Sequence, residues 1–315
     1  MKYIFIFFVS FISLNLHSQN ALDYYNQAKA KDELKDYKKA IVLYTKAIEL
    51  NPKLVSAYYK RGNSRIDLAN KTVSKNSIKV YLNHYQESIR DYDTAIELNS
   101  NFADVYLMRG IAELNGNEDA AVVDFLKAIK LNPAEILAYK NLGNCKYNSR
   151  DFEGAIECYN KCIAIDPNFF PAYFNRGLCR IEMEDNVNAL KDFNKSIELA
   201  PTHAASYYQR GNTSQGNMED SNAIIDFSKA IELNPNLFEA YYSMGISKAN
   251  LTLYKEAIKD YNITIKLSPR YAEAYYQRAN CKINLKDNKG ACKDYHKAAS
   301  FFYKPAIEKL KQYCN

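Results

Sequence analysis

The sequence contains no tryptophan and few histidines. Its 315 residues include ten glycines and four histidines, and the histidines are scattered along the chain. No spacing among His, Cys, Asp or Glu suits a metal ion, and no glycine-rich loop or recognisable nucleophile motif is present. These absences favour a protein that is not an enzyme, and they give no evidence for a catalytic residue, a metal site or a cofactor.

Neither sign of charge dominates. The chain has 42 Lys and Arg against 36 Asp and Glu, interspersed, for a net charge of +6. Nucleic-acid binding needs a concentrated basic face, so a nucleic-acid partner is not predicted. The abundant apolar residues and 27 tyrosines are sufficient for a packed core.

The first residues differ from the rest of the chain. Lys2 precedes an apolar run from Tyr3 to Ile12, and the sequence turns polar by Ser18. This order is typical of a secretory signal peptide, predicted at 1–18 with cleavage before Gln19. The alternative is an uncleaved anchor, but a membrane span needs roughly twenty apolar residues. We therefore expect an exported protein, periplasmic or secreted, with no stable membrane insertion after cleavage.

A short phrase, Ile-Glu-Leu-Asn-Pro or a near relative, recurs along the chain. Its last position repeats every 34 residues from Pro133 onward, and one earlier step is longer by 14 residues. That position holds Pro52, Ser100, Pro133, Pro167, Pro201, Pro235 and Pro269. A fixed period of this length is the signature of a repeat architecture, so the whole chain is read in register.

Within each period the large and small residues keep helical spacings of three and four. A tyrosine, then a small residue four positions later, marks a first helix; a second small residue and an aromatic mark a second helix. The first small position holds Ala28, Gly62, Gly110, Gly143, Gly177, Gly211, Gly245 and Ala279. The later aromatic position holds Tyr44, Tyr92, Phe125, Tyr159, Phe193, Phe227, Tyr261 and Tyr295. Small residues allow two helices to approach closely, and aromatics fill the space beside them.

This pattern resembles the tetratricopeptide repeat (TPR) family over most of the chain, with Tyr where the family often has Trp. The resemblance implies an all-α fold, a right-handed α–α superhelix or solenoid of eight helix-turn-helix units. A capping helix at 303–315 should follow, with Ile307 and Leu310 facing inward. The expected repeats span 21–54, 55–102 with the 14-residue insertion, 103–135, 136–169, 170–203, 204–237, 238–271 and 272–302, together 21–302.

Arginine and aspartate co-occur within repeats. Every repeat with an arginine just before the first small position also has an aspartate just before the second-helix aromatic. This covariation predicts an ion pair inside each hairpin, and a charged ligand site is the alternative. The predicted pairs are Arg61–Asp91, Arg109–Asp124, Arg176–Asp192, Arg210–Asp226 and Arg278–Asp294.

In the TPR family, the first helices line a concave groove that binds peptides. The residues after the core tyrosine and after the small position would line it here, and many are aromatic or asparagine. Rings supply contact area, and amides donate to and accept from a peptide backbone. The alternative is packing between repeats combined with duplication of a two-repeat unit. The candidate peptide- or protein-binding residues are Tyr59, Asn63, Lys140, Asn144, Phe174, Asn175, Tyr208, Asn212, Tyr242, Tyr276 and Asn280.

Some family members grip a C-terminal carboxylate with Lys, Asn, Asn, Lys and Arg over three repeats. Lys140, Asn144 and Asn175 match the first three positions. Ala205 and Gln209 occupy the other two, so the basic half is missing and a carboxylate clamp is not expected.

Two features keep alternatives open. Most of the seven cysteines occupy small-residue positions and are interpreted as buried thiols, while Cys158, Cys292 and Cys314 do not fit this pattern. The insertion around Lys71 to His84 is either a second contact site or a tolerated elongation of the hairpin.

Taken together, the sequence predicts an exported, non-catalytic scaffold or adaptor that binds a peptide or protein partner in its groove. A structural subunit or assembly chaperone of a cell-envelope complex is the alternative. A glycan-binding or enzymatic accessory protein is a more distant one. The fold is shared by proteins with many partners, so the sequence does not name the ligand.

Overall fold

The computed structural model describes residues 20–72 and 78–314, so the predicted signal peptide lies outside the described residues. In the described part every regular element is an α-helix, 17 in all, which confirms the all-α repeat architecture. The chain divides into two compact units, Met1–Ala138 and Tyr139–Asn315, and the division lies within α7. The helices are α1 (Ala21–Glu33), α2 (Tyr37–Leu50), α3 (Val55–Thr72), α4 (Ile78–Leu98), α5 (Ala103–Glu113), α6 (Glu118–Leu131), α7 (Ile136–Asn148), α8 (Phe152–Ile165), α9 (Phe170–Glu182), α10 (Asn186–Leu199), α11 (Ala204–Gly216), α12 (Asp220–Leu233), α13 (Phe238–Asn250), α14 (Tyr254–Leu267), α15 (Ala272–Asn284), α16 (Asn288–Ala299) and α17 (Lys304–Tyr313).

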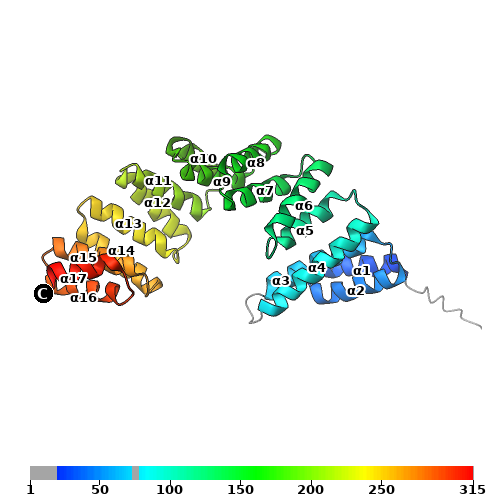
Figure 1. Cartoon of the computed structure of the whole chain (residues 1–315), viewed down its shortest axis with the longest axis horizontal. Coiled ribbons are helices and arrows are strands. Elements are labelled where there is room, and N and C mark those ends of the chain that lie inside the picture. The colour runs from blue at the N-terminus through cyan, green and yellow to red at the C-terminus, as the bar shows by residue number, and fades with distance from the viewer. Residues whose placement is uncertain (1–19, 73–77, 315) are drawn as a thin grey trace, which may run out of the picture. The chain divides into compact units, whose positions relative to one another are not determined.

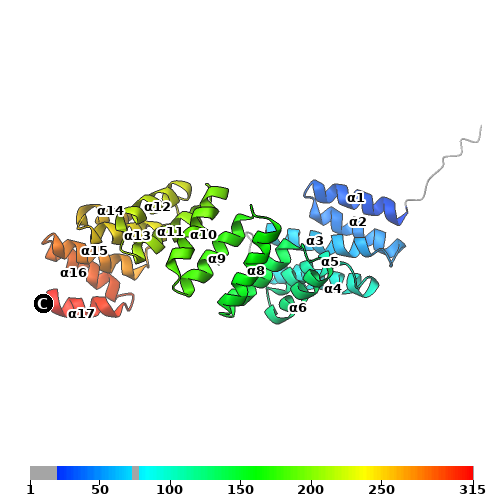
Figure 2. The ribbon, with the colours of Figure 1, turned by 90° about the horizontal axis from the view of Figure 1, so that it is seen from above.

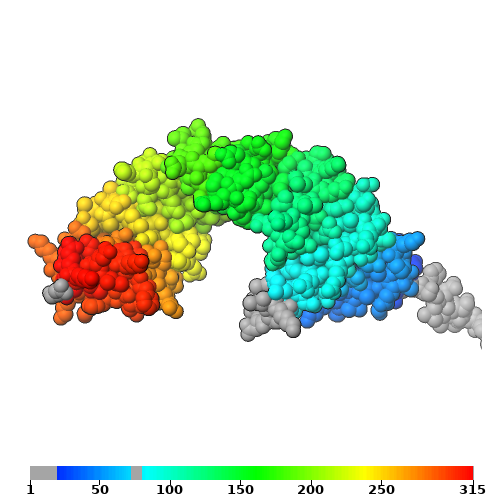
Figure 3. All heavy atoms as spheres, viewed as in Figure 1, coloured from blue at the N-terminus to red at the C-terminus, as the bar shows by residue number. Residues whose placement is uncertain are grey.

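Each unit is a stack of helical hairpins. In the first unit α1 packs on α2, α3 on α4 and α5 on α6, and α2 and α4 also pack on the next hairpin. In the second unit the same order runs from α8 to α17 (Figure 1). Side chains fill the spaces between neighbouring helices of a unit (Figure 3). No helix within the described ranges is both long and apolar enough to cross a membrane.

Polar gaps in the sequence become tight turns that start the second helices. Asp151 is a representative N-cap, whose carboxylate accepts a hydrogen bond from the Gly154 N–H at 2.9 Å. The preceding residue, Arg150, adopts the left-handed conformation with φ 65° that reverses the chain after the first helix. The same cap recurs at Asp36, Asn117, Asp185 and Asp287.

The second-helix aromatics are the centre of each hairpin, as predicted. Their side chains are almost completely buried against the first small position of the same hairpin. A Cβ added at Gly177 would lie 2.7 Å from the Phe193 ring, so a larger residue there requires the ring to shift. Burial at the tyrosine position of the first helix is weaker than expected. The residue before that tyrosine is the deeply buried one, for example Ala172 before Tyr173.

All five predicted ion pairs form within their own hairpins. The shortest N···O distances are 2.6 Å for Arg61–Asp91, 2.7 Å for Arg109–Asp124, 2.7 Å for Arg176–Asp192, 2.6 Å for Arg210–Asp226 and 2.5 Å for Arg278–Asp294. Each guanidinium also lies over the tyrosine three residues earlier, as Arg210 lies over Tyr207 with 5.7 Å to the ring centroid. The covariation therefore reports a structural pair.

These arginines have a second role, which the covariation within single repeats does not reveal. The Nη1 of Arg176 donates to Oδ1 of Asn160 in the preceding hairpin, and Arg210 reaches Asn194 in the same way at 2.7 Å. Arg61, Arg109 and Arg278 make the equivalent bonds to Thr45, Asp93 and Asn262. Each arginine therefore joins two neighbouring hairpins as well as the two helices of its own.

The last helix, α17, caps the second unit and is joined to it covalently. It packs against α16 (Figure 2), and Cys292 of α16 forms a disulfide with Cys314. The other five cysteines are buried thiols. Leu310 packs on the core of the last hairpin as expected, but Ile307 is exposed. Ala306 takes the buried position instead, which rotates the inward face of α17 by one residue.

The insertion lengthens both helices of the second hairpin. The helix α3 has 18 residues and α4 has 21, against 13 and 14 in most other hairpins. The Nζ of Lys71 reaches the carbonyl of Lys35 and lies over the Tyr37 ring, so the end of α3 packs on the first hairpin. Residues 73–77 of the insertion lie outside the described residues.

Candidate functional site

The candidate rings lie on one side of the first helices, which we call the first-helix face. Each is half-buried and contacts the buried aromatic of its own hairpin. The ring centroids are 6.4 Å apart for Tyr59–Tyr92, 6.0 Å for Phe174–Phe193, 6.0 Å for Tyr208–Phe227, 6.0 Å for Tyr242–Tyr261 and 5.8 Å for Tyr276–Tyr295. One edge of each ring is therefore left for other contacts.

Several of these rings also contact the residue that begins the next hairpin. Tyr242 lies 4.9 Å from Tyr271, and Phe174 lies 5.0 Å from His203. Tyr59–Phe102 and Tyr276–Tyr303 repeat the contact. These contacts agree with packing between repeats, the alternative that the sequence left open for this face. These rings pack between neighbouring hairpins. Replacing one with a small residue is therefore expected to lower the stability of the stack, whether or not it also weakens partner binding.

Three asparagines of the first-helix face accept a hydrogen bond from the second-helix tyrosine of their own hairpin, a bond that the sequence did not lead us to expect. The hydroxyl of Tyr92 donates to Oδ1 of Asn63 at 2.8 Å. Tyr159 and Tyr295 donate in the same way to Asn144 at 2.8 Å and Asn280 at 2.7 Å. Where the second-helix aromatic is Phe125 or Phe193, the facing position is Ile111 or Leu178. The alternation of asparagine with aliphatic residues thus largely follows the alternation of tyrosine with phenylalanine.

Two neighbouring hairpins break this rule in opposite directions. Asn212 occupies the position of Asn144 and Asn280, but its hairpin has Phe227 in place of the tyrosine, so no phenol hydroxyl is available to bond its amide. Ile246 faces Tyr261, whose buried hydroxyl has no hydrogen-bond partner among the described residues. Burial raises the pKa of the Tyr261 phenol well above its usual range, so it stays protonated. Asn212 therefore differs from Asn63, Asn144 and Asn280, because it makes no hydrogen bond to the second-helix aromatic of its own hairpin.

Side chains of α7, α8 and α9 line an open polar cavity of about 300 Å³ on this face. Nδ2 of Asn175 donates to Oδ1 of Asn144 at 3.1 Å, and the Tyr159 hydroxyl converges on the same oxygen. The cavity is lined by Asn144, Tyr147, Asn148, Tyr159, Asn175 and Leu178. Such a set of amides and phenols can both donate to and accept from the backbone of a peptide.

Lys140 lies one helical turn before Asn144 on α7 and is half-buried. Burial lowers the pKa of its ammonium group, because the charged form loses hydration. Two of the three matched clamp positions, Asn144 and Asn175, thus come together in one cavity. Tyr59 and Asn63 belong to the first unit and form their contacts there.

No cluster of His, Cys, Asp or Glu within residues 20–72 and 78–314 has the geometry of a metal site. The buried thiols of Cys158, Cys162 and Cys179 have pKa values raised to about 11, 12 and 12 by desolvation. Thiols in this state are poor nucleophiles near neutral pH.

Five family models match the chain, and all describe TPR repeats. They cover residues 28–65, 77–136, 136–169, 158–191 and 272–302. A comparison with curated protein sequences gives no match.

Solved structures with the same fold include YrrB, a TPR protein with an unusual peptide-binding site. YrrB is 23% identical, with a TM-score of 0.53 over 59% of this chain and 97% of YrrB. MamA is 28% identical, with a TM-score of 0.50 over 53% of this chain and 97% of MamA. The C-terminal part of a TPR repeat-containing protein from Cytophaga hutchinsonii is 18% identical, with a TM-score of 0.61 over 80% and 98% of the two chains.

Proposed function

Because the chain belongs to the tetratricopeptide repeat family, we propose that it is a non-catalytic scaffold that binds a peptide or protein partner on its first-helix face. The fold is generally a module for protein interaction. The observation that carries the proposal is the polar cavity between α7 and α9, lined by Asn144 and Asn175. Its amides match the alternating donors and acceptors of a peptide backbone, and the half-buried rings beside it offer rigid apolar contact.

Asn212 extends this surface on α11 in the second unit. Asparagines that are held by a tyrosine have already used part of their hydrogen-bonding capacity within the hairpin. The hairpin of Asn212 has Phe227 in place of the tyrosine, so a bond from the Asn212 amide to a partner breaks no bond of this kind. We place the energetically important contacts at Asn175 and Asn212, because interface energy concentrates in a few residues.

The double variant Asn175→Ala with Asn212→Ala tests the proposed surface. We expect the Kd for a partner captured from an envelope extract to rise about tenfold or more, which corresponds to about 1.4 kcal/mol. The melting temperature should fall only slightly, because, among the described residues, the one bond lost is that from Asn175 to Asn144, worth about 1 kcal/mol. Binding is measured by pull-down with quantitative mass spectrometry and then by titration with the identified partner.

The matched control is Asn168→Ala, an exposed asparagine in the loop between α8 and α9. It should bind like the unmodified protein. Unchanged capture by a stably folded double variant would place the partner site elsewhere and reject the proposal. Tyrosine variants are poor tests of binding, because the rings also wedge neighbouring hairpins together.

We also infer that the protein is exported, so that it meets its partner outside the cytoplasm. Two observations support this: the apolar run from Tyr3 to Ile12 after Lys2, and the Cys292–Cys314 disulfide, a bond that persists in oxidising compartments. N-terminal sequencing of protein from the envelope fraction should begin at or near Gln19. Recovery of intact Met1 there would contradict cleavage and indicate an anchor.

A further inference from the structure

Four of the six second-helix aspartates receive a cation from one particular position of the first helix. This position lies four residues after the arginine position, one turn further along the same helix. Arg180 reaches Oδ2 of Asp192 at 2.7 Å, and Lys282 reaches Oδ2 of Asp294 at 2.7 Å. Lys248 pairs with Asp260 and Arg65 with Asp91. In three of these four hairpins the aspartate therefore has two cationic partners, and in one it has Lys248 in place of an arginine.

The second cation also has a second acceptor. Nη1 of Arg180 donates to the carbonyl of Asn188 at 3.2 Å, one turn before Asp192. Arg65 and Lys282 use the equivalent carbonyls, of Glu87 at 3.1 Å and Gly290 at 3.5 Å. The repeat thus has a defined receptor for a cation, which consists of one carboxylate oxygen and one helix carbonyl.

The sixth hairpin keeps the receptor but lacks the cation. Ser214 occupies the position held by Arg180 and Lys282 elsewhere, and its short side chain does not reach Asp226. Asp226 is buried and receives bonds from Nε and Nη2 of Arg210 at 2.8 and 2.6 Å. Among the described residues, Oδ2 of Asp226 accepts a bond from the Arg210 Nε alone. Oδ2 of Asp192 and Oδ2 of Asp294 each also accept a bond from a second cation.

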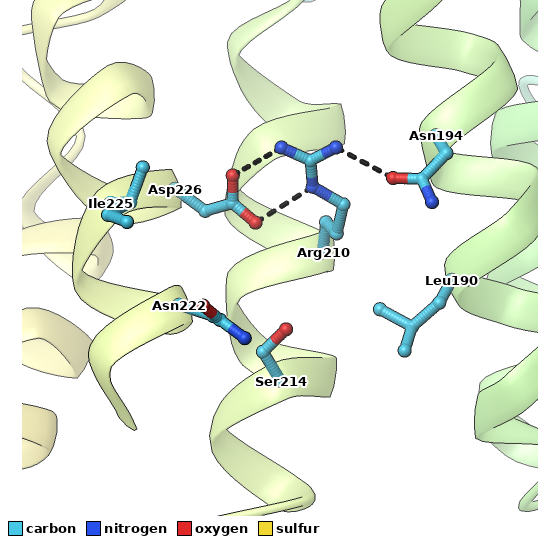
Figure 4. Close-up of a pocket in the computed structure, with 7 residues that line it drawn as sticks. All are labelled: Leu190, Asn194, Arg210, Ser214, Asn222, Ile225 and Asp226. Carbon is cyan, nitrogen blue, oxygen red and sulfur yellow. Dashed lines mark hydrogen bonds and ion pairs between the residues drawn. The ribbon is translucent and has the colours of Figure 1, made fainter. Parts of the chain in front are cut away.

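A cavity of about 260 Å³ occupies the place of the missing side chain. Figure 4 shows Ser214 and Asn222 below the Arg210–Asp226 pair, with Leu190 facing them from α10. Ile225, 67% exposed, belongs to the same lining. The cavity therefore combines a buried carboxylate with apolar side chains, the arrangement that suits a charged head on an alkyl stem.

We propose that this cavity is a binding site for the side chain of a lysine supplied by a protein partner. The ammonium group would bond Oδ2 of Asp226 and the carbonyl of Asn222, as Lys282 bonds Asp294 and Gly290. Its alkyl stem would lie against Leu190 and Ile225. The site belongs to α10, α11 and α12 and uses no residue of the first-helix face, so it is a second point of recognition.

A small probe tests the site directly. Nα-acetyl-lysinamide carries the ammonium group and stem, and Nα-acetyl-norleucinamide is its uncharged match. We expect the lysine probe to cause saturable shifts in the amide NMR signals of Ser214, Asn222 and Asp226, and the norleucine probe to bind at least tenfold more weakly. Equal binding of the two probes, or no saturable shift, would overturn the proposal.

Two variants of the full chain sharpen the test. Ser214→Lys supplies the missing cation from within and should abolish binding of the lysine probe. It should also raise the melting temperature by about 2 °C or more, because it completes the Asp226 receptor. Ser214→Ala keeps the cavity open and should bind within twofold of the unmodified protein. Undiminished binding to folded Ser214→Lys, or loss of binding in folded Ser214→Ala, would show that the probe does not use this cavity.

Discussion

Replacing Arg210 with leucine is expected to lower the free energy of unfolding by about 3 kcal/mol, because Asp226 then stays buried without its cation. Asp226 is only 5% exposed, and both of its oxygens accept bonds from Arg210. The change also removes the bond from Arg210 to Asn194 that joins two hairpins. Urea unfolding measures the loss, and amide hydrogen exchange should localise it to α11 and α12.

The deficit of Arg210→Leu should depend on pH. Without the guanidinium, Asp226 is left buried with no arginine partner, as Asp260 is. Asp260, which has a lysine but no arginine, already has a pKa raised by desolvation. A carboxyl group whose pKa is raised in the folded state lowers the free energy of unfolding where the group is ionised. It has no such effect at a pH so low that the group is protonated in both the folded and the unfolded state. The deficit should therefore be complete at pH 7, shrink as the pH falls toward the unfolded carboxyl pKa of about 3.9, and be smallest below it.

The chain itself supplies the control for this prediction. The fourth hairpin has Leu142 and Cys158 in the positions of Arg210 and Asp226. The double variant Arg210→Leu with Asp226→Cys copies that natural pair, and it should recover at least half of the loss. If the double variant is as unstable as the single one, the cost comes from lost packing rather than from a stranded charge.

Breaking the Cys292–Cys314 disulfide should destabilise α16 and α17 by about 3 kcal/mol. The two cysteines are separated by 22 positions, and opening a loop of that length returns chain entropy to the unfolded state. The double variant Cys292→Ser with Cys314→Ser should show faster amide exchange in α16 and α17, with the other hairpins of the second unit little changed. In an array of repeats, stability is a sum of local terms, so the effect stays local.

Reduction of the unmodified protein provides an independent check. A reductant should reproduce the exchange pattern of the double serine variant and have no further effect on that variant. Thiol titration of the denatured, non-reduced protein should count five thiols, those of Cys145, Cys158, Cys162, Cys179 and Cys281. A count of seven would show that the bond does not form.

Features that depend on two repeat positions could be predicted from the sequence, because the repeats provide internal comparisons. The co-occurrence of Arg210 with Asp226, and of its counterparts, correctly predicted the ion pairs. The pairing of asparagine with tyrosine is present in the same repeats, but the asparagines were interpreted as groove residues or as packing between repeats, and not as partners of a tyrosine in their own hairpin. Asn144 shows the consequence, because it lies in the candidate cavity and also accepts a structural bond from Tyr159.

Other features depend on geometry that no repeat position records. The approach of Cys314 to Cys292 depends on how α17 docks, and this docking occurs once in the chain. The rotation that buries Ala306 instead of Ile307 has the same origin. The cavity at Ser214 is defined by an absent side chain, and a serine in a helix sequence does not reveal the room beside it.

The disulfide also determines how the C-terminal end of the chain carries mechanical load. Tension applied at Cys314 passes through the sulfur bridge to Cys292 in α16, so the backbone between them bears none of it. Under a steady pull, α17 can neither unwind nor lengthen the molecule, and the first length released comes from the chain before Cys292. The bridge therefore moves the first yielding point inward, to hairpins held by non-covalent contacts such as packing, ion pairs and hydrogen bonds.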